Sequence, residues 1–404
     1  MASATRKYRI LMIAPTSFFS DYGCSVRILE EARALQRLGD EVSICTYRNG
    51  QDVADLDIRR TLSIPFREHY VVGSSPHKIG FDLLLFWTVL FAALRRRPDI
   101  IHAHMHEGAL IGLVIGFLLR IPMIFDFQGS LTSEMVDHKF LRRDGWVYRP
   151  LRWLETKIDL WSPVILTSSH NAEKLLVEEF GCKPDKIYTV ADRVDPEAFF
   201  PASDEEESLL ARRRQSLRIP PARKVIAYLG LLAEYQGTDV LLEAARQVLQ
   251  RQSEVHFLIM GFPAVEHYRH KAHQLGIADH CTFTGVIPYP RARDYLAVGD
   301  VAVAPKLSAT EGNGKILNYM AMAMPTVAFD VPVSREYLGE QGIYATAGDA
   351  AALARGLLEA LEGEANPDRG LILRRRVQES YSWDSAAEVI HQTYELALDH
   401  QHTS

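Results

Sequence analysis

Residues 301–334 read VAVAPKLSATEGNGKILNYMAMAMPTVAFDVPVS, and this stretch decides the fold class of the chain. A short apolar run leads to Glu311 and the glycine loop Gly312–Lys315, then to apolar residues at helical spacing up to Pro325, and then to a second apolar run. The first N–H groups of a helix have no internal partner and lie at the positive end of its dipole, so they suit a diphosphate. Glycine lets that backbone come close to a ligand, and a carboxylate beside it can accept hydrogen bonds from sugar hydroxyls.

The same stretch resembles the donor-site signature of retaining glycosyltransferases of the GT-B fold, family four (glycosyl transferases group one). That family carries two glutamates eight positions apart, followed by Met-Ala-x-Gly-x-Pro. Here Tyr319–Pro325 fits the tail, with Ala323 where glycine is usual, and Asn318 holds the place of the second glutamate. Glu311 is then the first glutamate, one residue closer than usual. The alternative is an ordinary βαβ unit with a charged helix start, but further family features elsewhere in the chain favour the resemblance.

The resemblance covers nearly the whole chain and implies an α/β fold of two doubly wound, Rossmann-like domains that face each other across a cleft. Runs typical of buried strands alternate with helical patterns, and a length of 404 residues favours two domains. We expect an acceptor-side domain at residues 1–195 and a nucleotide-sugar-binding domain at residues 196–376. Residues 377–404 are expected to form a helix that returns to the first domain.

The composition indicates a soluble globular protein, with 47% hydrophobic and 24% charged residues. A formal net charge of -6 argues against nucleic acid as the main partner. The four cysteines form no CxxC pair, and the N-terminal apolar run is too short for a signal peptide. These observations predict a cytoplasmic protein, and the resemblance adds the inner face of the membrane as a place of action.

Two cations that family members use at the donor diphosphate are missing. An arginine usually follows the glycine that ends the first strand of the second domain, and a lysine usually precedes the second glycine of that loop. Leu231 and Gln236 stand at these positions. We expect Lys315 to compensate, together with Lys306 or Arg27, because backbone amides alone offer less than charge-assisted contacts.

The resemblance implies roles for the other donor-site residues. Glu311 is expected to hold hexose hydroxyls, the N–H groups of Gly312–Ile316 to hold sugar and diphosphate, and Asn318 to bond the ribose. Val286 and Ile287 are expected to flank the base. The complete donor-binding set is Gly23, Arg27, Gln236, Gly237, Val286, Ile287, Gly312, Asn313, Gly314, Lys315, Ile316 and Asn318.

On the acceptor side, the stretch Asp99–His106 resembles the family's D-x-x-H-x-H strand, which makes His102, His104 and Asp126 acceptor-side candidates. Alternate histidines on a strand face one side, so a metal site is conceivable from the residues alone. The resemblance explains two of the histidines without a metal, and we expect none. Gln128 stands where many members have a histidine near the transfer point; glutamine cannot titrate, but it can orient a hydroxyl.

Two strongly apolar segments, residues 80–94 and 110–119, leave two interpretations open. Both are shorter than the roughly 20 residues that a membrane span needs. They fit helices buried in a doubly wound domain, and they also fit a surface that faces a membrane. The second interpretation matters because many members of the family act on lipid-linked acceptors.

We therefore expect a retaining hexosyltransferase that uses Glu311 and Gln128 at its catalytic centre and needs no cofactor. Its expected donor is a UDP or GDP sugar, and its expected acceptor is a glycan, a lipid-linked glycan or a small molecule. The alternative is a degenerate relative that serves as a non-catalytic binding or scaffold subunit. Four changed family positions, at Gln128, Leu231, Gln236 and Asn318, support that alternative. The intact loop from Glu311 to Lys315 supports the enzyme.

Overall fold

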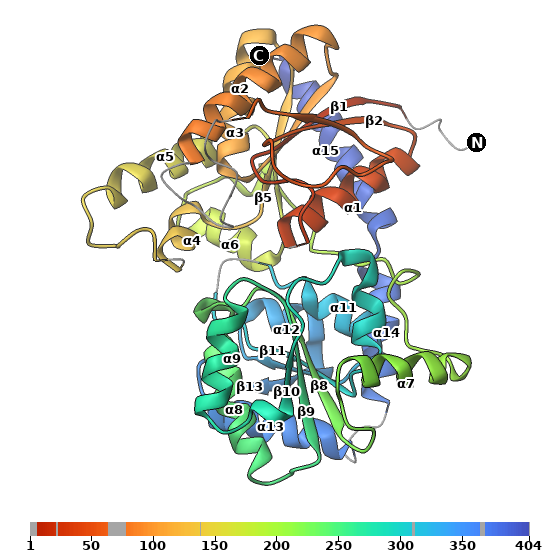
Figure 1. Cartoon of the computed structure of the whole chain (residues 1–404). Helices are drawn as coiled ribbons and strands as arrows, with labels where there is room; N and C mark the ends of the chain where they lie inside the picture. Colours follow the sequence, from red (N-terminus) through yellow and green to blue (C-terminus); the bar gives the residue numbers. More distant parts are fainter. Residues whose placement is uncertain are drawn as a thin grey trace. The chain divides into compact units, whose positions relative to one another are not determined.

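The computed structural model describes residues 6–21, 23–63, 78–137, 139–308, 312–363 and 368–403. Glu311, the carboxylate predicted to hold the sugar, lies outside the described residues. The chain divides into two compact units, one built mainly from Met1–Ala191 and Trp383–Ser404 and the other mainly from Asp192–Ala309 and Asn313–Ser382. These divisions fall at residues 191 and 382, where the sequence placed boundaries at 195 and 376. Each unit contains its own parallel sheet with helices on both faces (Figure 1).

The first sheet has seven parallel strands in the order β3-β2-β1-β4-β5-β6-β7. The strands are β1 (Arg9–Ala14), β2 (Glu41–Thr46), β3 (Asp57–Arg60), β4 (Ile100–His104), β5 (Met123–Phe127), β6 (Ile165–Thr167) and β7 (Ile187–Thr189). The helices are α1 (Gly23–Arg37), α2 (Lys78–Arg95), α3 (Met105–Leu119), α4 (Leu131–Asp137), α5 (Tyr148–Trp161), α6 (His170–Glu178) and α15 (Trp383–Thr403). The central strands β4 and β5 are buried at every residue, as expected of strands covered on both faces.

The second sheet has six parallel strands in the order β10-β9-β8-β11-β12-β13. The strands are β8 (Lys224–Leu229), β9 (Val255–Met260), β10 (Cys281–Phe283), β11 (Val301–Ala304), β12 (Thr326–Phe329) and β13 (Ile343–Ala345). The helices are α7 (Glu207–Ser216), α8 (Thr238–Leu249), α9 (Val265–Gln274), α10 (Ala292–Leu296), α11 (Lys315–Ala321), α12 (Pro332–Leu338), α13 (Ala350–Glu362) and α14 (Arg369–Ser380). The predicted fold class of two doubly wound domains is thereby confirmed.

The last helix, α15, is part of the first unit and packs against α1 and β5. The hydroxyl of Tyr394 lies 2.9 Å from Nδ1 of His102 on β4, and both groups are buried. His391 bonds Asp40 at the turn between α1 and β2. These two polar contacts, together with an edge-to-face contact between the rings of Tyr8 and Tyr394, hold the C-terminal helix against the first sheet.

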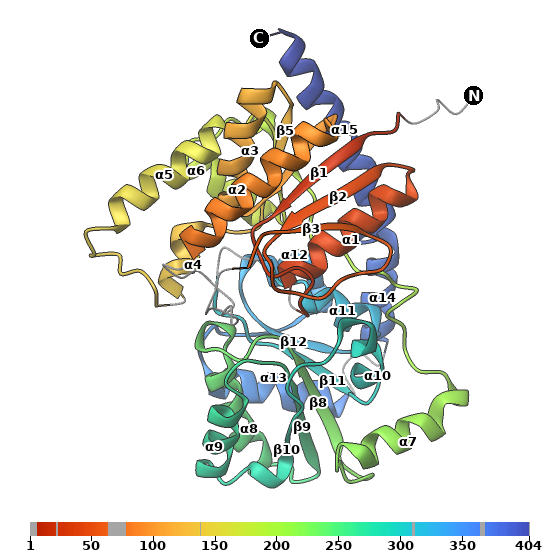
Figure 2. The same ribbon diagram turned by 45° about the horizontal axis from the view of Figure 1, so that its top comes forward.

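The apolar segments predicted at residues 80–94 and 110–119 form α2 and α3, which lie side by side on one face of the first sheet (Figure 2). Each buries only one face: Leu85 and Val89 of α2 are fully buried, whereas Phe91 and Phe117 are mostly exposed. Both helices therefore cover the sheet of a doubly wound domain with one face and leave an apolar face exposed, so both interpretations remain open. No helix in the described part of the chain is long and apolar enough to cross a membrane.

Candidate active site

The predicted donor residues of the second unit lie on loops and on α11, beside a switch point of the second sheet. From β8 the chain continues to β9 and β10 on one side, and it returns to β11 on the other side. Ligands of open α/β sheets bind at the carboxyl ends of strands beside such a switch point. The loop after β8, residues 230–237, and the loop after β11, residues 305–314, both leave from this edge.

Lys315, the first residue of α11, reaches into the loop after β8. Its Nζ lies 2.7 Å from Oε1 of Gln236 and 4.7 Å from the centre of the Tyr228 ring. A Cβ added at Gly230 would lie 2.5 Å from this Nζ, so the ammonium group also packs on the glycine that ends β8. A cation from α11 thus occupies the loop in which the usual arginine and lysine are replaced by Leu231 and Gln236.

Gly237 is required where it stands. Its φ is +76°, a value that favours glycine, and an added Cβ would lie 1.8 Å from the carbonyl oxygen of Pro305. The loop after β8 can therefore lie directly against the loop after β11 only with glycine here. Gln236 is 6% exposed and is held by Lys315.

The side chain of Asn313, in the predicted donor loop, is buried and lacks hydrogen-bond partners in the described part of the chain. It is 2% exposed, and neither its amide nitrogen nor its amide oxygen has a hydrogen-bond partner among the described residues. A buried amide without partners costs free energy, so this group is a candidate for contact with a ligand or with water. A Cβ added at the neighbouring Gly314 would lie 3.4 Å from Oδ2 of Asp192, an ordinary van der Waals distance.

Two further residues of the predicted donor set, Ile316 and Asn318, have backbone N–H groups close to carbonyl groups of the preceding turn. The N–H of Ile316 donates to the carbonyl of Asn313 at 3.0 Å, so this member of the predicted set already has a partner within the protein. The N–H of Asn318 lies 3.4 Å from the carbonyl of Gly314. The Tyr319 hydroxyl accepts from the N–H of Leu229 at 2.7 Å and so anchors α11 to the end of β8.

Val286 and Ile287, the predicted neighbours of the base, follow β10 at the same edge of the sheet. Val286 is 54% exposed, whereas Ile287 is buried. Gly285 before them has a φ of +74° and open space around it. Val286 is therefore available to a flat apolar ligand, and Ile287 supports the loop from within.

In the first unit, Asp126 on β5 is the centre of a buried network. Arg27 of α1 grips its carboxylate with two hydrogen bonds, Nε to Oδ2 at 3.1 Å and Nη2 to Oδ1 at 2.9 Å. Arg27 also donates to the carbonyl of Val190 at 3.0 Å. Burial raises the pKa of Asp126, but the charge of Arg27 and the hydrogen bonds from His104 and Arg27 hold it well below its usual range.

Arg27 is 5% exposed, and its guanidinium is committed to Asp126, Val190 and Glu31. The structure therefore gives no support to its predicted role as a phosphate partner. Lys306 is also 5% exposed. Gly23, the other predicted donor residue of this unit, begins α1 and has nothing within 4 Å of an added Cβ.

His102 and His104 face the same side of β4, with ring centres 4.5 Å apart. One ligand atom from each of Glu31, His102, His104 and Asp126 lies within 4.8 Å of the others, an arrangement that could hold a metal ion. The Arg27 guanidinium, however, lies 3.0 Å from the Glu31 carboxylate and 2.9 Å from that of Asp126. The cluster thus contains its own cation, and we assign no metal to it. Burial and the neighbouring His104 lower the pKa of His102 well below its usual value, so that ring is neutral.

Gln128, directly after β5, belongs to the same network. Its amide nitrogen donates to Oδ2 of Asp126 at 2.8 Å and lies 3.4 Å from Nδ1 of His104. The side chain is only partly buried, and its Oε1 has no hydrogen bond among the described residues. With the nitrogen held by the carboxylate, the amide oxygen is the group presented to a ligand.

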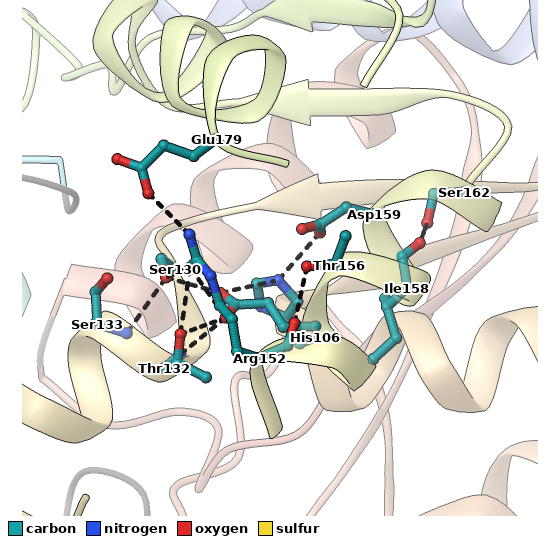
Figure 3. A network of polar contacts seen from close by, with 11 residues as sticks. His106, Ser130, Thr132, Ser133, Arg152, Thr156, Ile158, Asp159, Ser162 and Glu179 are labelled. Carbon is teal, nitrogen blue, oxygen red and sulfur yellow. Dashed lines mark hydrogen bonds and ion pairs between the residues drawn. The ribbon is translucent and has the colours of Figure 1, made fainter. Parts of the chain in front are cut away.

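A second network holds the loop after β5 to α5 (Figure 3). The buried Glu155 carboxylate accepts from the hydroxyls of Ser130 and Thr132, and Arg152 joins them at 3.3 Å. His106 lies on α3, not on the predicted histidine strand, because β4 ends at His104. It contacts Asp159 at 3.1 Å and has no part in the cluster around Asp126.

Sequence reasoning missed three of these residues. Glu31 lies one helical turn after Arg27, so the pair could have been expected, but nothing in the sequence indicated that both are buried. Tyr228 beneath Lys315 carried no signal, because a tyrosine in a strand is usually core. Tyr394 lies 292 residues after its partner His102, a separation that no local pattern reveals.

Two family descriptions of glycosyltransferases match the chain. Residues 223–363 match the family described as glycosyl transferases group 1, and residues 23–198 match the one described as Glycosyltransferase Family 4. Among curated proteins, the chain is 25% identical over 399 residues to the D-inositol 3-phosphate glycosyltransferase of Corynebacterium aurimucosum, covering 93% of this chain and 91% of that protein.

Solved structures share the fold. Sucrose-phosphate synthase from Thermosynechococcus elongatus superimposes with a TM-score of 0.80 at 18% identity, covering 96% of this chain and 98% of that one. The Anabaena protein HepE, in complex with UDP-glucose, superimposes with a TM-score of 0.76 at 13% identity, covering 96% and 99%.

Proposed function

The chain belongs to the family 4, group 1 glycosyltransferases with the GT-B fold, and from this premise we propose that it is a retaining hexosyltransferase that uses a nucleotide-diphosphate sugar. The observation that carries the proposal is the placement of Lys315. A lysine from α11 lies against Gln236 and Gly230, in the loop whose usual cations are absent. An ammonium group retained there by a different element suits a diphosphate.

The remaining donor contacts follow from the same edge of the second sheet. The side-chain amide of Asn313, which has no hydrogen-bond partner among the described residues, would bond the donor, together with the N–H groups of Gly312–Lys315, and Glu311 would hold the hexose hydroxyls. The exposed Val286 would cover one face of the base. A relative of similar fold is known with UDP-glucose, which supports a UDP sugar as the first donor to test.

On the acceptor side, Gln128 would orient a hydroxyl through its amide oxygen while Asp126 fixes its nitrogen. Because an amide does not titrate, the residue cannot be a general base. In a retaining transfer on one face of the sugar, the departing phosphate oxygen takes the proton of the attacking hydroxyl. The glycosidic bond to the diphosphate then breaks as the new one forms, and no protein base is needed. The acceptor would be a glycan, a lipid-linked glycan or a small molecule.

Calorimetric titration with UDP, GDP and ADP sugars tests this function on the wild type, Glu311→Ala and Lys315→Ala. We expect one nucleotide to bind, with affinity reduced about 10- to 150-fold in Lys315→Ala, the equivalent of about 1.5–3 kcal/mol for a charge-assisted contact. Lys224→Ala is the matched control, because Lys224 lies at the opposite end of β8 and pairs with Asp300. Absence of binding to every nucleotide would favour the non-catalytic scaffold instead. Transfer assays on lipid-linked and soluble acceptors would then identify the acceptor class.

A further inference from the structure

The outward face of α2 is apolar along its whole length. Its exposed positions are Ile79, Gly80, Leu83, Trp87, Phe91, Leu94 and Arg95, so the only charge among them stands at the last residue. Trp87 is 53% exposed and Phe91 64%. A helix that covers a sheet in a water-soluble protein normally turns a polar or charged face outward, so this helix departs from the rule over more than four turns.

The neighbouring helix α3 repeats the pattern. Its exposed positions are Val114, Phe117 and Leu118, and the exposed Arg120 follows at its C-terminus. Phe117 is 85% exposed. The two helices pack against each other, and Nη2 of Arg97 donates to the carbonyl of Leu119 at 3.3 Å, so their C-terminal ends lie together (Figures 1 and 2). We refer to the exposed apolar residues of both helices as the apolar helix face: Ile79, Leu83, Trp87, Phe91, Leu94, Val114, Phe117 and Leu118.

Charge in this part of the chain is one-sided. Between residues 78 and 161, the exposed basic residues in the described part are Arg95, Arg96, Arg97, Arg120, Lys139, Arg142, Arg143 and Arg149, and the exposed acidic residue is Asp144. The whole chain has a formal charge of -6, so this excess of arginine is local.

Exposed tryptophans mark the same region. Trp87 on α2, Trp146 before α5, and Trp153 and Trp161 on α5 are 53–89% exposed, while Trp383 is buried. Helix α5 packs against α3. Tryptophan prefers the boundary between lipid headgroups and acyl chains, because its ring is apolar and its N–H is polar.

We propose that the apolar helix face docks the protein onto a bilayer that contains anionic phospholipid. The apolar side chains enter the boundary of the acyl chains, and the arginines at the C-terminal ends of α2 and α3 contact the headgroup phosphates. A second protein copy would not explain the arginines at the C-terminal ends of α2 and α3, because the same surface on a partner would bring like charges together. A membrane supplies both the apolar layer and the negative charge. Docking of this kind is peripheral, and it does not depend on whether the protein catalyses sugar transfer.

Sedimentation of the full chain with sonicated vesicles tests the proposal, using phosphatidylcholine alone and a 3:1 mixture with phosphatidylglycerol, proportions on the order of those in anionic membranes. We expect binding to the mixed vesicles that weakens with salt. Trp87→Ser with Phe91→Ser should lower the partition coefficient at least about tenfold. Arg95→Ser with Arg96→Ser should lower it about fivefold for each arginine, and only on the anionic vesicles.

The matched control is Leu371→Ser with Ile372→Ser, two exposed apolar residues of α14 in the other unit, and it should bind like the wild type. Quenching of tryptophan fluorescence by acyl-chain-brominated lipid gives a second readout, which should fall in Trp87→Phe. Vesicle binding that the substitutions on α2 leave unchanged would overturn the proposal. So would a dimer in light scattering that Trp87→Ser with Phe91→Ser dissociates, in a protein that binds no vesicles. Nucleotide titration of the same variants keeps this result separate from the transferase activity.

Discussion

Lys315 Nζ donates to Oε1 of Gln236 at 2.7 Å, across 79 positions of sequence. The contact joins the first residue of α11 to the last residue before Gly237 in the loop after β8. In related enzymes that loop position carries the cation itself, and here it carries an amide that holds a cation from elsewhere. Lys315 thus brings a positive charge to this loop, beside the switch point of the second sheet.

A double variant with the lysine at position 236 instead of position 315 should still bind the donor. Lys315→Gln alone is expected to weaken nucleotide-sugar affinity about 10- to 150-fold, since a charge-assisted contact is worth about 1.5–3 kcal/mol. Adding Gln236→Lys should recover most of that loss, because the new ammonium group would occupy the same loop. Calorimetry on the two single variants and the double variant measures the coupling. A double variant no better than Lys315→Gln would show that the location of the charge is not what matters.

Because glutamine does not titrate, the dependence of kcat on pH should contain no pKa that belongs to Gln128. Gln128→Ala should lower kcat on the order of tenfold or more, because the acceptor hydroxyl loses an orienting contact, while the shape of log kcat against pH stays that of the wild type. Gln128→Glu introduces a carboxylate beside Asp126 and should add a new acidic limb. A bell-shaped wild-type profile that disappears in Gln128→Ala would contradict the assignment.

The pair of Arg27 and Asp126 is expected to be structural. Arg27→Met leaves Asp126 and Glu31 buried without their cation, which should destabilise the first unit by about 3–5 kcal/mol. All five tryptophans belong to this unit, so their fluorescence during urea unfolding reports on it separately from the other unit. Arg142→Ala removes the exposed partner of Asp144 and should leave the midpoint unchanged. A stable Arg27→Met protein with weakened nucleotide binding would restore the phosphate role to Arg27.

The fold could be predicted because its signals are local. Buried strands such as β1 and β9 read as continuous apolar runs, and the helices between them show the spacing of a half-buried face. The stretch around Tyr319 also indicated α11 correctly. Its hydroxyl contact with Leu229 on β8 was not predictable, since only the folded sheet brings the two residues together.

The site was harder, because side chains find partners that are distant in sequence. Arg27 was a candidate phosphate partner because it lies just inside the start of a helix. In the structure its guanidinium bonds Asp126 and Val190, which lie 99 and 163 positions away in sequence. His106 continued an alternating pattern of histidines, but β4 ends at His104, two residues before it. Exposure cannot be read from composition either, so the apolar run that forms α2 left open whether its outward face is covered.

Protonated His106 should make the stability of the first unit fall as the pH becomes alkaline. Burial disfavours its charged form, but the carboxylates of Asp159 and Glu155 outweigh burial and raise its pKa to about 9. In the unfolded chain the pKa is about 6.5. The folded state therefore binds the proton more tightly, and its stabilisation is complete below about pH 6.5 and is lost as pH rises towards 9.

Urea unfolding followed by tryptophan fluorescence should show a free energy of unfolding that falls on the order of 3 kcal/mol between about pH 6.5 and 9.5. His106→Gln should be less stable at neutral pH, because Asp159 loses its charged partner, and should lack most of that slope. His170→Gln, at a histidine exposed at the start of α6, should keep the wild-type slope. If His106→Gln retains the full alkaline loss, another group must titrate, and the charged pair of His106 and Asp159 would not exist at neutral pH.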